Sequence, residues 1–315
     1  MTTPAAETLP AISQAAPSNS LLRLTMRRLF RQRNAIIGAT ILAFLILVAI
    51  FAPALAPYDP TLSLLDIEPV TIRQEPCIHL FGCPEDQAQH IMGLDGNARD
   101  QFSRVIFGTR ISLFIGFSTV GLAIIIGTLL GAVAGYAGGW LDNVIMRLMD
   151  VLLAFPSFLL AIAIITVLGR GLQNALYAIA IVNIPHFARL IRASVLSIKE
   201  QEFVAATRAL GASPVWILMK RILPNALPPL IVQATLSIAG AILEAAALSF
   251  LGLGAQEPAS EWGTMLGRER GQVFTAPYLV FYPGFAIMLT VLAFNLLGDG
   301  LRDAMDPRLS QVSKR

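Results

Sequence analysis

The stretch Glu202-Phe-Val-Ala-Ala-Thr-Arg-Ala-Leu-Gly211-Ala-Ser-Pro214-Val-Trp-Ile-Leu-Met-Lys220-Arg-Ile-Leu-Pro224-Asn225 separates two long apolar runs of this chain. Its first half is rich in helix formers, and Gly211 suits the left-handed position that ends a helix. Ser213 can cap a second helix and Pro214 fits its first turn, while Leu223-Pro224 is expected to stop it. The segment therefore predicts a helix, a glycine turn, a second helix and a stop.

The composition around this segment is that of a membrane protein. Of 315 residues, 55% are hydrophobic and 14% are charged, and the mean hydropathy is +0.67. Soluble domains carry nearer a quarter charged residues. Each apolar run approaches or exceeds the roughly 20 residues that a helix needs to cross a bilayer. An all-α polytopic membrane protein with six transmembrane helices is predicted, at about 35–56, 111–135, 144–168, 175–196, 229–253 and 279–298.

The cations predict the orientation of these spans. Five arginines lie between Arg23 and Arg33, directly before the first apolar run. That run is too long for the apolar core of a signal peptide, so we expect an uncleaved helix that starts in the cytoplasm. In this orientation 16 of the 23 Lys and Arg residues lie at the cytoplasmic side and 7 lie outside, as the positive-inside rule requires. Both termini are then cytoplasmic.

This topology divides the chain into five parts. No internal repeat and no second soluble domain are found. The parts are a cytoplasmic tail with a basic juxtamembrane segment (1–34), the first transmembrane helix (35–56), an extracytoplasmic segment that ends in an amphipathic helix from Arg99 to Arg110 (57–110), a five-helix core with the cytoplasmic loop 198–225 (111–298) and a cytoplasmic C-terminal tail (299–315).

Four polar residues interrupt the apolar spans: Asp150, Asn183, Glu244 and Asn295. Ionisable side chains inside a membrane are costly, and they usually face the protein interior or a wet cavity. Each of the four therefore either lines a pathway or makes a hydrogen bond between helices, and both interpretations stay open. Arg147 lies three residues before Asp150, a spacing that allows an ion pair on one helix face.

Three glycines, Gly127, Gly131 and Gly135, follow one another at four-residue spacing in the second apolar run. Small residues on one face let two helix backbones pack closely in lipid. We interpret them as a packing surface rather than a site.

Cys77, His79, Cys83 and His90 form the one group with metal-like chemistry. Two thiols and two imidazoles could bind zinc. The segment is predicted to lie in an oxidising compartment, however, where a disulfide is the commoner fate. A disulfide between Cys77 and Cys83 is preferred over free thiols, and both are preferred over a metal site, because the ligand spacing is not a standard one.

No catalytic constellation is found in the sequence. The three lysines, Lys199, Lys220 and Lys314, do not follow a glycine, so the chain contains no P-loop. We expect no catalytic residue, no metal and no cofactor on this chain.

The segment from Glu202 to Asn225 resembles the Glu-Ala-Ala loop of the membrane subunits of ABC importers. Ala206, Gly211, Leu223 and Pro224 are in register with that motif, whereas Ala205, Thr207 and Arg221 replace its usual residues. In that family the first helix and its turn form a coupling helix that docks in a groove of an ATPase. The resemblance implies an ATPase-coupling site, with Glu202 or Arg208 replacing the usual acid. Its residues are Glu202, Ala206, Arg208, Gly211, Ala212, Ser213, Leu223 and Pro224.

Four further motifs resemble one branch of the family, the C-type permease of dipeptide, oligopeptide and nickel importers. Leu94 and Ala98 depart from its usual Thr and Gly. The resemblance covers nearly the whole chain and implies the type I ABC importer permease fold in a prokaryotic inner membrane. The motifs begin at Gly93-Leu-Asp95-Gly-Asn-Ala-Arg99-Asp100, Gly135-Tyr-Ala-Gly138-Gly139-Trp140, Glu244-Ala-Ala-Ala-Leu-Ser249 and Asn295-Leu-Leu-Gly298-Asp299.

The function implied by the resemblance is import of di- or oligopeptides, with this chain forming half of the pathway. Its implied partners are a homologous second permease subunit, two ABC ATPase subunits that bind ATP and Mg, an extracytoplasmic substrate-binding protein and membrane lipid, but no nucleic acid. Nickel chelates, glutathione or another small solute stay open as substrates. A stand-alone secondary transporter would require inverted repeats and paired pathway charges, and a bare membrane scaffold would leave the loop 202–224 unexplained.

Overall fold

The computed structural model describes residues 32–305 together with Leu29. The basic segment and both predicted cytoplasmic tails lie largely outside the described residues. Within the described part the chain is helical, and its β-type pairing is limited to two isolated bridges, Cys77 with His90 and Leu94 with Asp100. The predicted all-α architecture is therefore confirmed.

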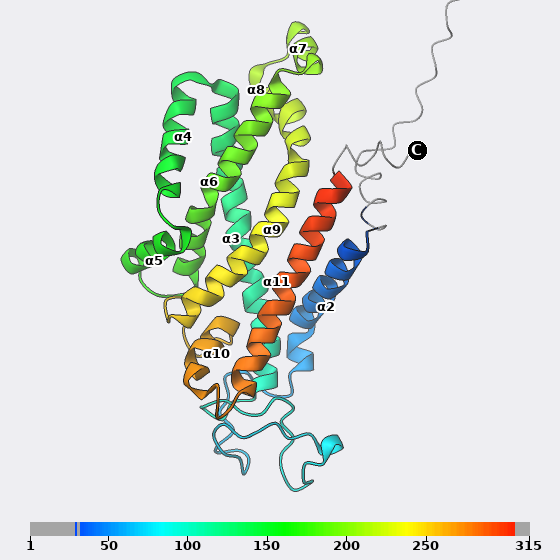
Figure 1. The fold of residues 1–315 in the computed structure, drawn as a ribbon, viewed down its shortest axis with the longest axis vertical. Coiled ribbons are helices and arrows are strands. Elements are labelled where there is room, and N and C mark those ends of the chain that lie inside the picture. Colours follow the sequence, from blue (N-terminus) through cyan, green and yellow to red (C-terminus); the bar gives the residue numbers. More distant parts are fainter. Residues whose placement is uncertain (1–28, 30–31, 306–315) are drawn as a thin grey trace, which may run out of the picture.

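Five long helices run side by side and form the body of the molecule (Figure 1). Each is long and apolar enough to cross a membrane, and a pair of shorter helices bent by 93° supplies a sixth crossing if it counts as one span. When the bent pair counts as one span, the structure has the six predicted spans, and one of the six is broken. The long helices are α2 (Arg33–Leu55), α3 (Gln101–Ala137), α6 (Leu172–Lys199), α9 (Leu223–Phe250) and α11 (Tyr278–Met305), and the bent pair is α4 (Gly139–Leu153) with α5 (Ser157–Leu168).

The break between α4 and α5 corrects the continuous span predicted over 144–168. It falls at Phe155-Pro156, and Pro156 has an extended backbone with ψ of 127°. Proline lacks a backbone N–H and disfavours the helical conformation in the residue before it. The helix therefore ends before Pro156 and restarts in a new direction at Ser157.

The contact between α3 and α6 explains the regularly spaced glycines of the second span. A Cβ atom added to Gly127 or Gly131 would come closer than 3.0 Å to atoms of Phe187 or Ala188 on α6. Only glycine allows the two backbones to approach this closely. The interpretation of these glycines as a packing surface agrees with this geometry.

The start of α3 lies outside the predicted membrane span. Asp100 caps the helix by accepting hydrogen bonds from the backbone N–H and the hydroxyl of Ser103, at 2.8 and 2.7 Å. The predicted amphipathic helix Arg99–Arg110 is thus not a separate element but the first turns of α3. A helix of 37 residues is about 55 Å long, well beyond the roughly 30 Å core of a bilayer.

The predicted helix stop at Leu223-Pro224 is wrong. A short helix α8 (Pro214–Ile217), a π-helical turn η2 (Leu218–Ile222) and α9 follow one another without interruption, so helical backbone runs from Pro214 to Phe250. Pro224 lies in the first turn after the π-helical turn, where a proline costs little. The pair Pro228-Pro229 also lies inside α9.

The two ends of the bundle carry the irregular segments (Figure 1). Helix α7 (Glu202–Ala209) projects from one end, and the start of α2 and the end of α11 lie at this same end, as the predicted cytoplasmic termini require. At the other end, residues 57–100 with the turn η1 (His79–Phe81) lie beneath α10 (Trp262–Glu269) and η3 (Arg270–Gln272).

Candidate functional site

The cytoplasmic tip, defined here as Glu202–Pro224, has the predicted helix, glycine turn and second helix. Gly211 has φ of +83°, and no atom lies within 4 Å of the place its Cβ would take. The backbone conformation, and not crowding, therefore requires glycine. Ser213 caps α8 by accepting a hydrogen bond from the backbone N–H of Trp216 at 3.4 Å, and Pro214 is the first residue of α8.

Most of the predicted coupling residues lie on the surface of the cytoplasmic tip. Three fully buried apolar side chains, Val204, Ile217 and Ile222, attach the tip to the core of the bundle. The tip therefore has a fixed shape and a free surface. Of the predicted residues, Glu202, Ala206, Arg208, Gly211, Ser213 and Pro224 are exposed, and Ala212 and Leu223 are half-buried.

Exposed apolar side chains on the cytoplasmic tip were missed by the sequence analysis. Leu210 is 88% exposed and Val215 is 71% exposed, on either side of the glycine turn, and Phe203 and Trp216 are also exposed. Apolar side chains gathered on an exposed surface mark an interaction site. The signal was present in the sequence as apolar residues on both sides of Gly211.

The polar residues of α4 pair with α6 and not with one another. Arg189 Nη2 on α6 donates to Asp150 Oδ1 at 2.5 Å, and Arg192 donates to both carboxylate oxygens of Asp142 at 2.5 and 2.7 Å. The predicted pair of Arg147 with Asp150 is therefore wrong. Because α4 and α6 run side by side, a partner on the neighbouring helix reaches Asp150 better than one on its own helix.

Glu244 and Asn183 are brought together between α9 and α6. The Asn183 side chain lies next to the Glu244 carboxyl group, and Asn183 Nδ2 donates its hydrogen bond to the carbonyl oxygen of Ile179 at 2.9 Å. The second oxygen, Glu244 Oε2, is buried and has no hydrogen-bond partner among residues 32–305. Asn295 is exposed on α11, and the hydrogen bonds of the described residues do not join it to this pair.

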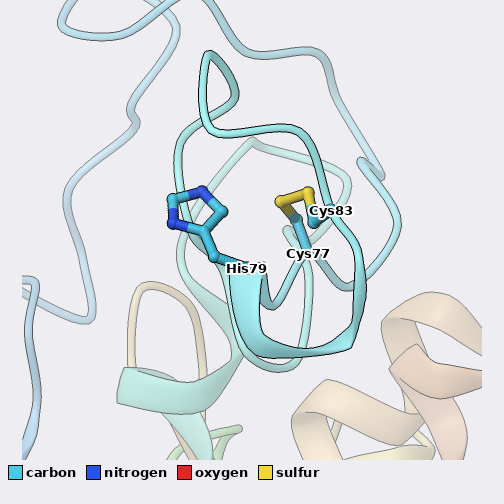
Figure 2. A group of neighbouring side chains, drawn as sticks. All are labelled: Cys77, His79 and Cys83. Carbon is cyan, nitrogen blue, oxygen red and sulfur yellow. A yellow bond between two sulfur atoms is a disulfide. The ribbon is translucent and has the colours of Figure 1, made fainter.

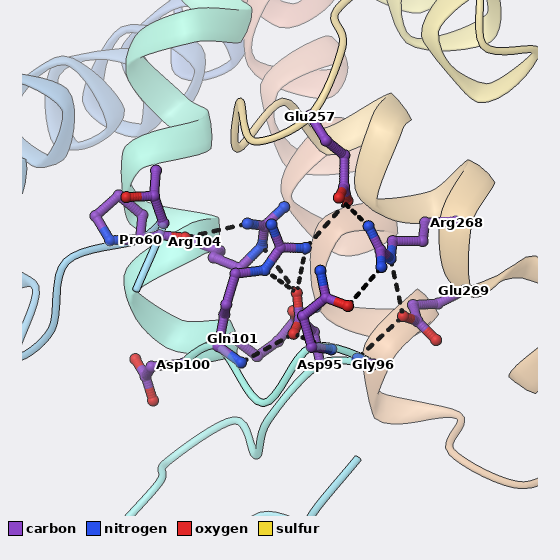
Figure 3. Close-up of polar contacts among 12 residues, drawn as sticks. Pro60, Asp95, Gly96, Asp100, Gln101, Arg104, Glu257, Arg268 and Glu269 are labelled. Carbon is purple, nitrogen blue, oxygen red and sulfur yellow. Dashed lines mark hydrogen bonds and ion pairs between the residues drawn. The ribbon is translucent and has the colours of Figure 1, made fainter. Parts of the chain in front are cut away.

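A network of charged residues closes the opposite end of the bundle (Figure 3). Arg99 Nε donates to Asp95 Oδ2 at 2.7 Å, and Arg99 Nη2 donates to Glu257 Oε1 at 3.0 Å. Glu257 also pairs with Arg268, next to Glu269 in the sequence. We call residues 57–100 and 254–272, joined by this network, the outer cap.

Three further contacts extend the network of the outer cap. Arg73 Nε donates to Glu269 Oε2 at 3.1 Å, and Gly96 N–H donates to Glu269 Oε1 at 3.1 Å. Arg104 Nε lies 3.4 Å from Asp95 Oδ2. The contacts of Arg73 and Gly96 with Glu269 and of Arg99 with Glu257 join residues more than 150 positions apart, so a single sequence gives no sign of them.

The charge environment of Glu257 reflects this pairing. Burial raises the pKa of the Glu257 carboxyl group, but hydrogen bonds from Arg268 and Arg99 outweigh burial and hold the pKa below its ordinary value of 4.5. Glu257 is therefore ionised at neutral pH and holds the two arginines together.

Cys77 and Cys83 are joined by a disulfide in the outer cap, with their Cα atoms 5.4 Å apart (Figure 2). His79 lies beside them, and its ligating nitrogen and the two sulfur atoms are within 4.8 Å of one another. Zinc binds cysteine as the thiolate, so the disulfide-bonded sulfurs do not fit a metal. His90 does not join this group: its side chain is fully buried, with Nδ1 3.1 Å from Asp100 Oδ1.

Two profiles of known protein families match this chain. The profile described as "Binding-protein-dependent transport system inner membrane component" matches residues 127–311, more than half of the chain. A second profile, "N-terminal TM domain of oligopeptide transport permease C", matches residues 20–76.

Similar curated proteins cover most of the chain. The dipeptide transport system permease protein DppC of Alkalihalophilus pseudofirmus is 50% identical over 91% of this chain and 90% of its own length. The di/tripeptide transport system permease protein DppC of Pseudomonas aeruginosa is 46% identical over 89% of this chain and 90% of its own length. The glutathione transport system permease protein GsiD of Escherichia coli is 47% identical over 90% of this chain and 89% of its own length.

Among solved structures, the fold is similar to a chain of the MetNI methionine ABC transporter in an inward-facing conformation. The TM-score is 0.54 at 21% identity, and the match covers 65% of this chain and 98% of that one. At this identity the likeness concerns the fold alone.

Proposed function

Because this chain belongs to the family of binding-protein-dependent transport system inner membrane components, we propose that it imports short peptides. It is a multi-pass inner-membrane protein and a permease subunit of an ATP-driven ABC importer. The observation that carries the peptide proposal is the 50% identity, over 91% of the chain, to a dipeptide permease.

In this proposal the chain forms half of the translocation pathway. A homologous second permease subunit supplies the other half, and an extracytoplasmic binding protein delivers the peptide to the outer cap. Two ATPase subunits bind ATP and Mg and contact the cytoplasmic tips. Support for the last contact comes from the exposed Leu210 and Val215 on the tip, and from the lack of a P-loop in the sequence.

The uninterrupted helix from Pro214 to Phe250 suggests how the tip acts on the pathway. A displacement of the tip by the ATPases reaches α9 through continuous helical backbone, because no loop separates the two. ATP binding can then shift the permease between inward- and outward-facing states only if the ATPases contact the tip more favourably in one state.

Glutathione is the second candidate substrate. It is itself a tripeptide, and a glutathione permease is 47% identical over 90% of this chain. The resemblance to a di/tripeptide permease is of similar strength, at 46% over 89%. The two candidates share a free ammonium group and a free carboxylate at opposite ends of a short chain.

The proposal is tested by reconstituting the full complex in proteoliposomes and measuring uptake of a radiolabelled dipeptide. We expect uptake that requires the binding protein and hydrolysable ATP, and co-purification of the ATPase chains with this subunit. Competition by excess glutathione separates the two substrates. Uptake that persists after every ATPase is removed, or an ATP-dependent complex that imports neither compound, would contradict the proposal.

A further inference from the structure

A polar stripe formed by Gln233, Ser237, Gly240 and Glu244 runs along α9 on the side turned away from α3. The opposite side carries Ile238 and Ile242, which pack against Gly116 of α3. The members of the stripe are four, three and four residues apart, which places them on one face of the helix.

The stripe borders open space at Gly240 and at its cytoplasmic end. Gly240 is exposed, with no atom within 4 Å of the place its Cβ would take. Gln233 Nε2 donates to Ser237 Oγ at 3.2 Å. Gln233 also lines a cavity of about 470 Å³ between α9 and α11, on the cytoplasmic half of the bundle. The stripe therefore connects a cytoplasmic cavity to Glu244.

The chemistry of the stripe indicates that it does not face lipid. Exposed side chains on other helices are large and apolar, for example Phe44 on α2 at 58% and Leu129 on α3 at 63%. A carboxylic acid among amide and hydroxyl groups is costly on such a lipid-facing surface. Glu244 is six residues from the end of α9 at Phe250, which places it about 9 Å along the helix from that end.

Glu244 has an unused hydrogen-bonding position. Asn183 lies beside the carboxyl group, while Oε2 is buried without a partner in the described part of the chain. An ionised carboxylate that is partly withdrawn from water requires a hydrogen-bond donor or a cation. A primary ammonium group supplies a positive charge and three N–H donors, and every peptide with a free N-terminus carries one.

We propose that the stripe lines the translocation pathway and that Glu244 binds the N-terminal ammonium group of the passing peptide. This inference rests on the proposed function. Gln233 and Glu244 are eleven residues apart, or about 17 Å along α9, and an extended di- or tripeptide spans about 7 to 10 Å. The peptide backbone can therefore lie along Gly240 and Ser237 while its ammonium group contacts Glu244. Asn183 positions the carboxyl group.

Such a contact is suited to transport rather than to retention. A single ammonium–carboxylate pair that stays in contact with water is a weak interaction. The peptide would be oriented with its amine toward Glu244 and released easily, so the binding protein would still set most of the affinity.

The inference is tested by cysteine labelling in the assembled complex. Both native cysteines are in the disulfide, so this chain starts without a free thiol. Ser237→Cys and Gly240→Cys are compared with Phe44→Cys and Leu129→Cys, the exposed apolar controls, using a charged methanethiosulfonate reagent and mass spectrometry of this chain. We expect the stripe positions to react at least tenfold faster than the controls. A dipeptide at millimolar concentration should slow that reaction at least threefold, and its N-acetylated form should not.

Two results would overturn the inference. If the stripe positions are labelled as slowly as the controls, the stripe does not face water. Equal protection by the free and the acetylated dipeptide, or protection by neither, would mean that the ammonium group is not recognised.

Substitution of Glu244 gives an independent measurement. In the reconstituted complex, Glu244→Gln should abolish dipeptide protection of Ser237→Cys and lower peptide uptake about tenfold, while ATP hydrolysis stimulated by the binding protein stays within twofold. Glu244→Asp should restore both. If uptake and ATP hydrolysis fall together in both variants, Glu244 has only a packing role. Failure of the unsubstituted complex to import peptide would contradict the proposed function instead.

Discussion

The outer cap and the cytoplasmic tip use charged residues in opposite ways. In the cap, Arg99 and Asp95 pair with each other, and each side chain is only 4% exposed. In the tip, Glu202 and Arg208 are exposed, and no ion pair joins either of them to another residue in the part of the chain that the structure describes. The cap satisfies its charges internally, whereas the tip leaves its charges exposed.

The comparison also separates two kinds of structural requirement. The cap depends on side-chain pairing between distant segments, because an unpaired buried charge is strongly destabilising. The tip depends on one backbone conformation at Gly211 and on three buried apolar residues, Val204, Ile217 and Ile222. Substitutions in the cap should therefore act on stability, and substitutions in the tip should act on coupling.

The largest expected effect is that of Arg99→Met in the outer cap. The substitution leaves Asp95 buried without its closest partner, and removing one member of a buried pair costs about 3 to 5 kcal/mol. The thermal unfolding midpoint of the purified complex should fall clearly, and the amount of assembled transporter should fall with it, while ATP hydrolysed per peptide stays unchanged in what assembles.

The control for this prediction is Arg270→Met. Arg270 is exposed and lies over the ring of Phe250, with its Cζ atom 5.8 Å from the ring centre. Its loss should cost no more than about 1 kcal/mol. Equal destabilisation by the two substitutions would show that the pairing in the cap is not what stabilises it.

Gly211→Val is expected to have the next largest effect, on coupling. A β-branched residue at φ of +83° costs on the order of 1 to 3 kcal/mol and should distort the turn. Uptake should fall at least thirtyfold while ATP hydrolysis persists. Gly139→Val is the matched control, because Gly139 also has positive φ (+60°) and open space around it, but it lies outside the tip, as the first residue of α4. If both variants lose uptake equally, the tip has no special role.

Leu210→Ser combined with Val215→Ser should have a smaller effect on the tip. Both side chains are already exposed, so the stability of the isolated subunit should not change. If an ATPase buries them, the double variant should weaken ATPase binding about tenfold, which corresponds to about 1.4 kcal/mol. Titration of detergent-solubilised permease with ATPase measures this. Unchanged affinity would show that shape and charge alone hold the ATPase.

The smallest expected effect is the pH dependence contributed by Glu257 in the cap. Its pKa is lowered in the folded state relative to 4.5, so its contribution to stability is present above the unfolded pKa and is lost as the pH falls through the lower, folded pKa. About a third of the side chain is exposed, so the contribution should be well under about 1 kcal/mol. The stability difference between the wild type and Glu257→Gln should be constant above about pH 6 and should shrink as the pH falls through 4.5 and below it. A constant difference would contradict this.

The features that could be predicted from the sequence are those that depend on residues next to one another in the chain. Apolar length predicted the spans, and Gly211, Ser213 and Pro214 predicted the turn of the tip because each residue acts on its immediate neighbours. Local signals failed at prolines, since Phe155-Pro156 breaks a helix and Leu223-Pro224 does not. The difference lies in the π-helical turn before Pro224, which depends on packing as well as on sequence.

The unpredicted part is determined by contacts between distant residues. Arg99 meets Glu257, and Arg73 meets Glu269, across most of the chain. Asp150 pairs with Arg189 on another helix instead of the nearby Arg147. A disulfide between Cys77 and Cys83, by contrast, was the preferred alternative because the two cysteines lie in a segment predicted to be in an oxidising, extracytoplasmic compartment.

The outer cap has a mechanical consequence for the whole subunit. It joins the segment before α3 to the segment between α9 and α11, so the outer ends of these helices are held together. That end can therefore be the fixed point about which the helices rotate. The rod from Pro214 to Phe250 has 37 residues and is about 55 Å long, so each degree of rotation about its outer end moves the cytoplasmic end by about 1 Å. Spin-label distances that change more at the outer end than at the tip during ATP turnover would rule this out.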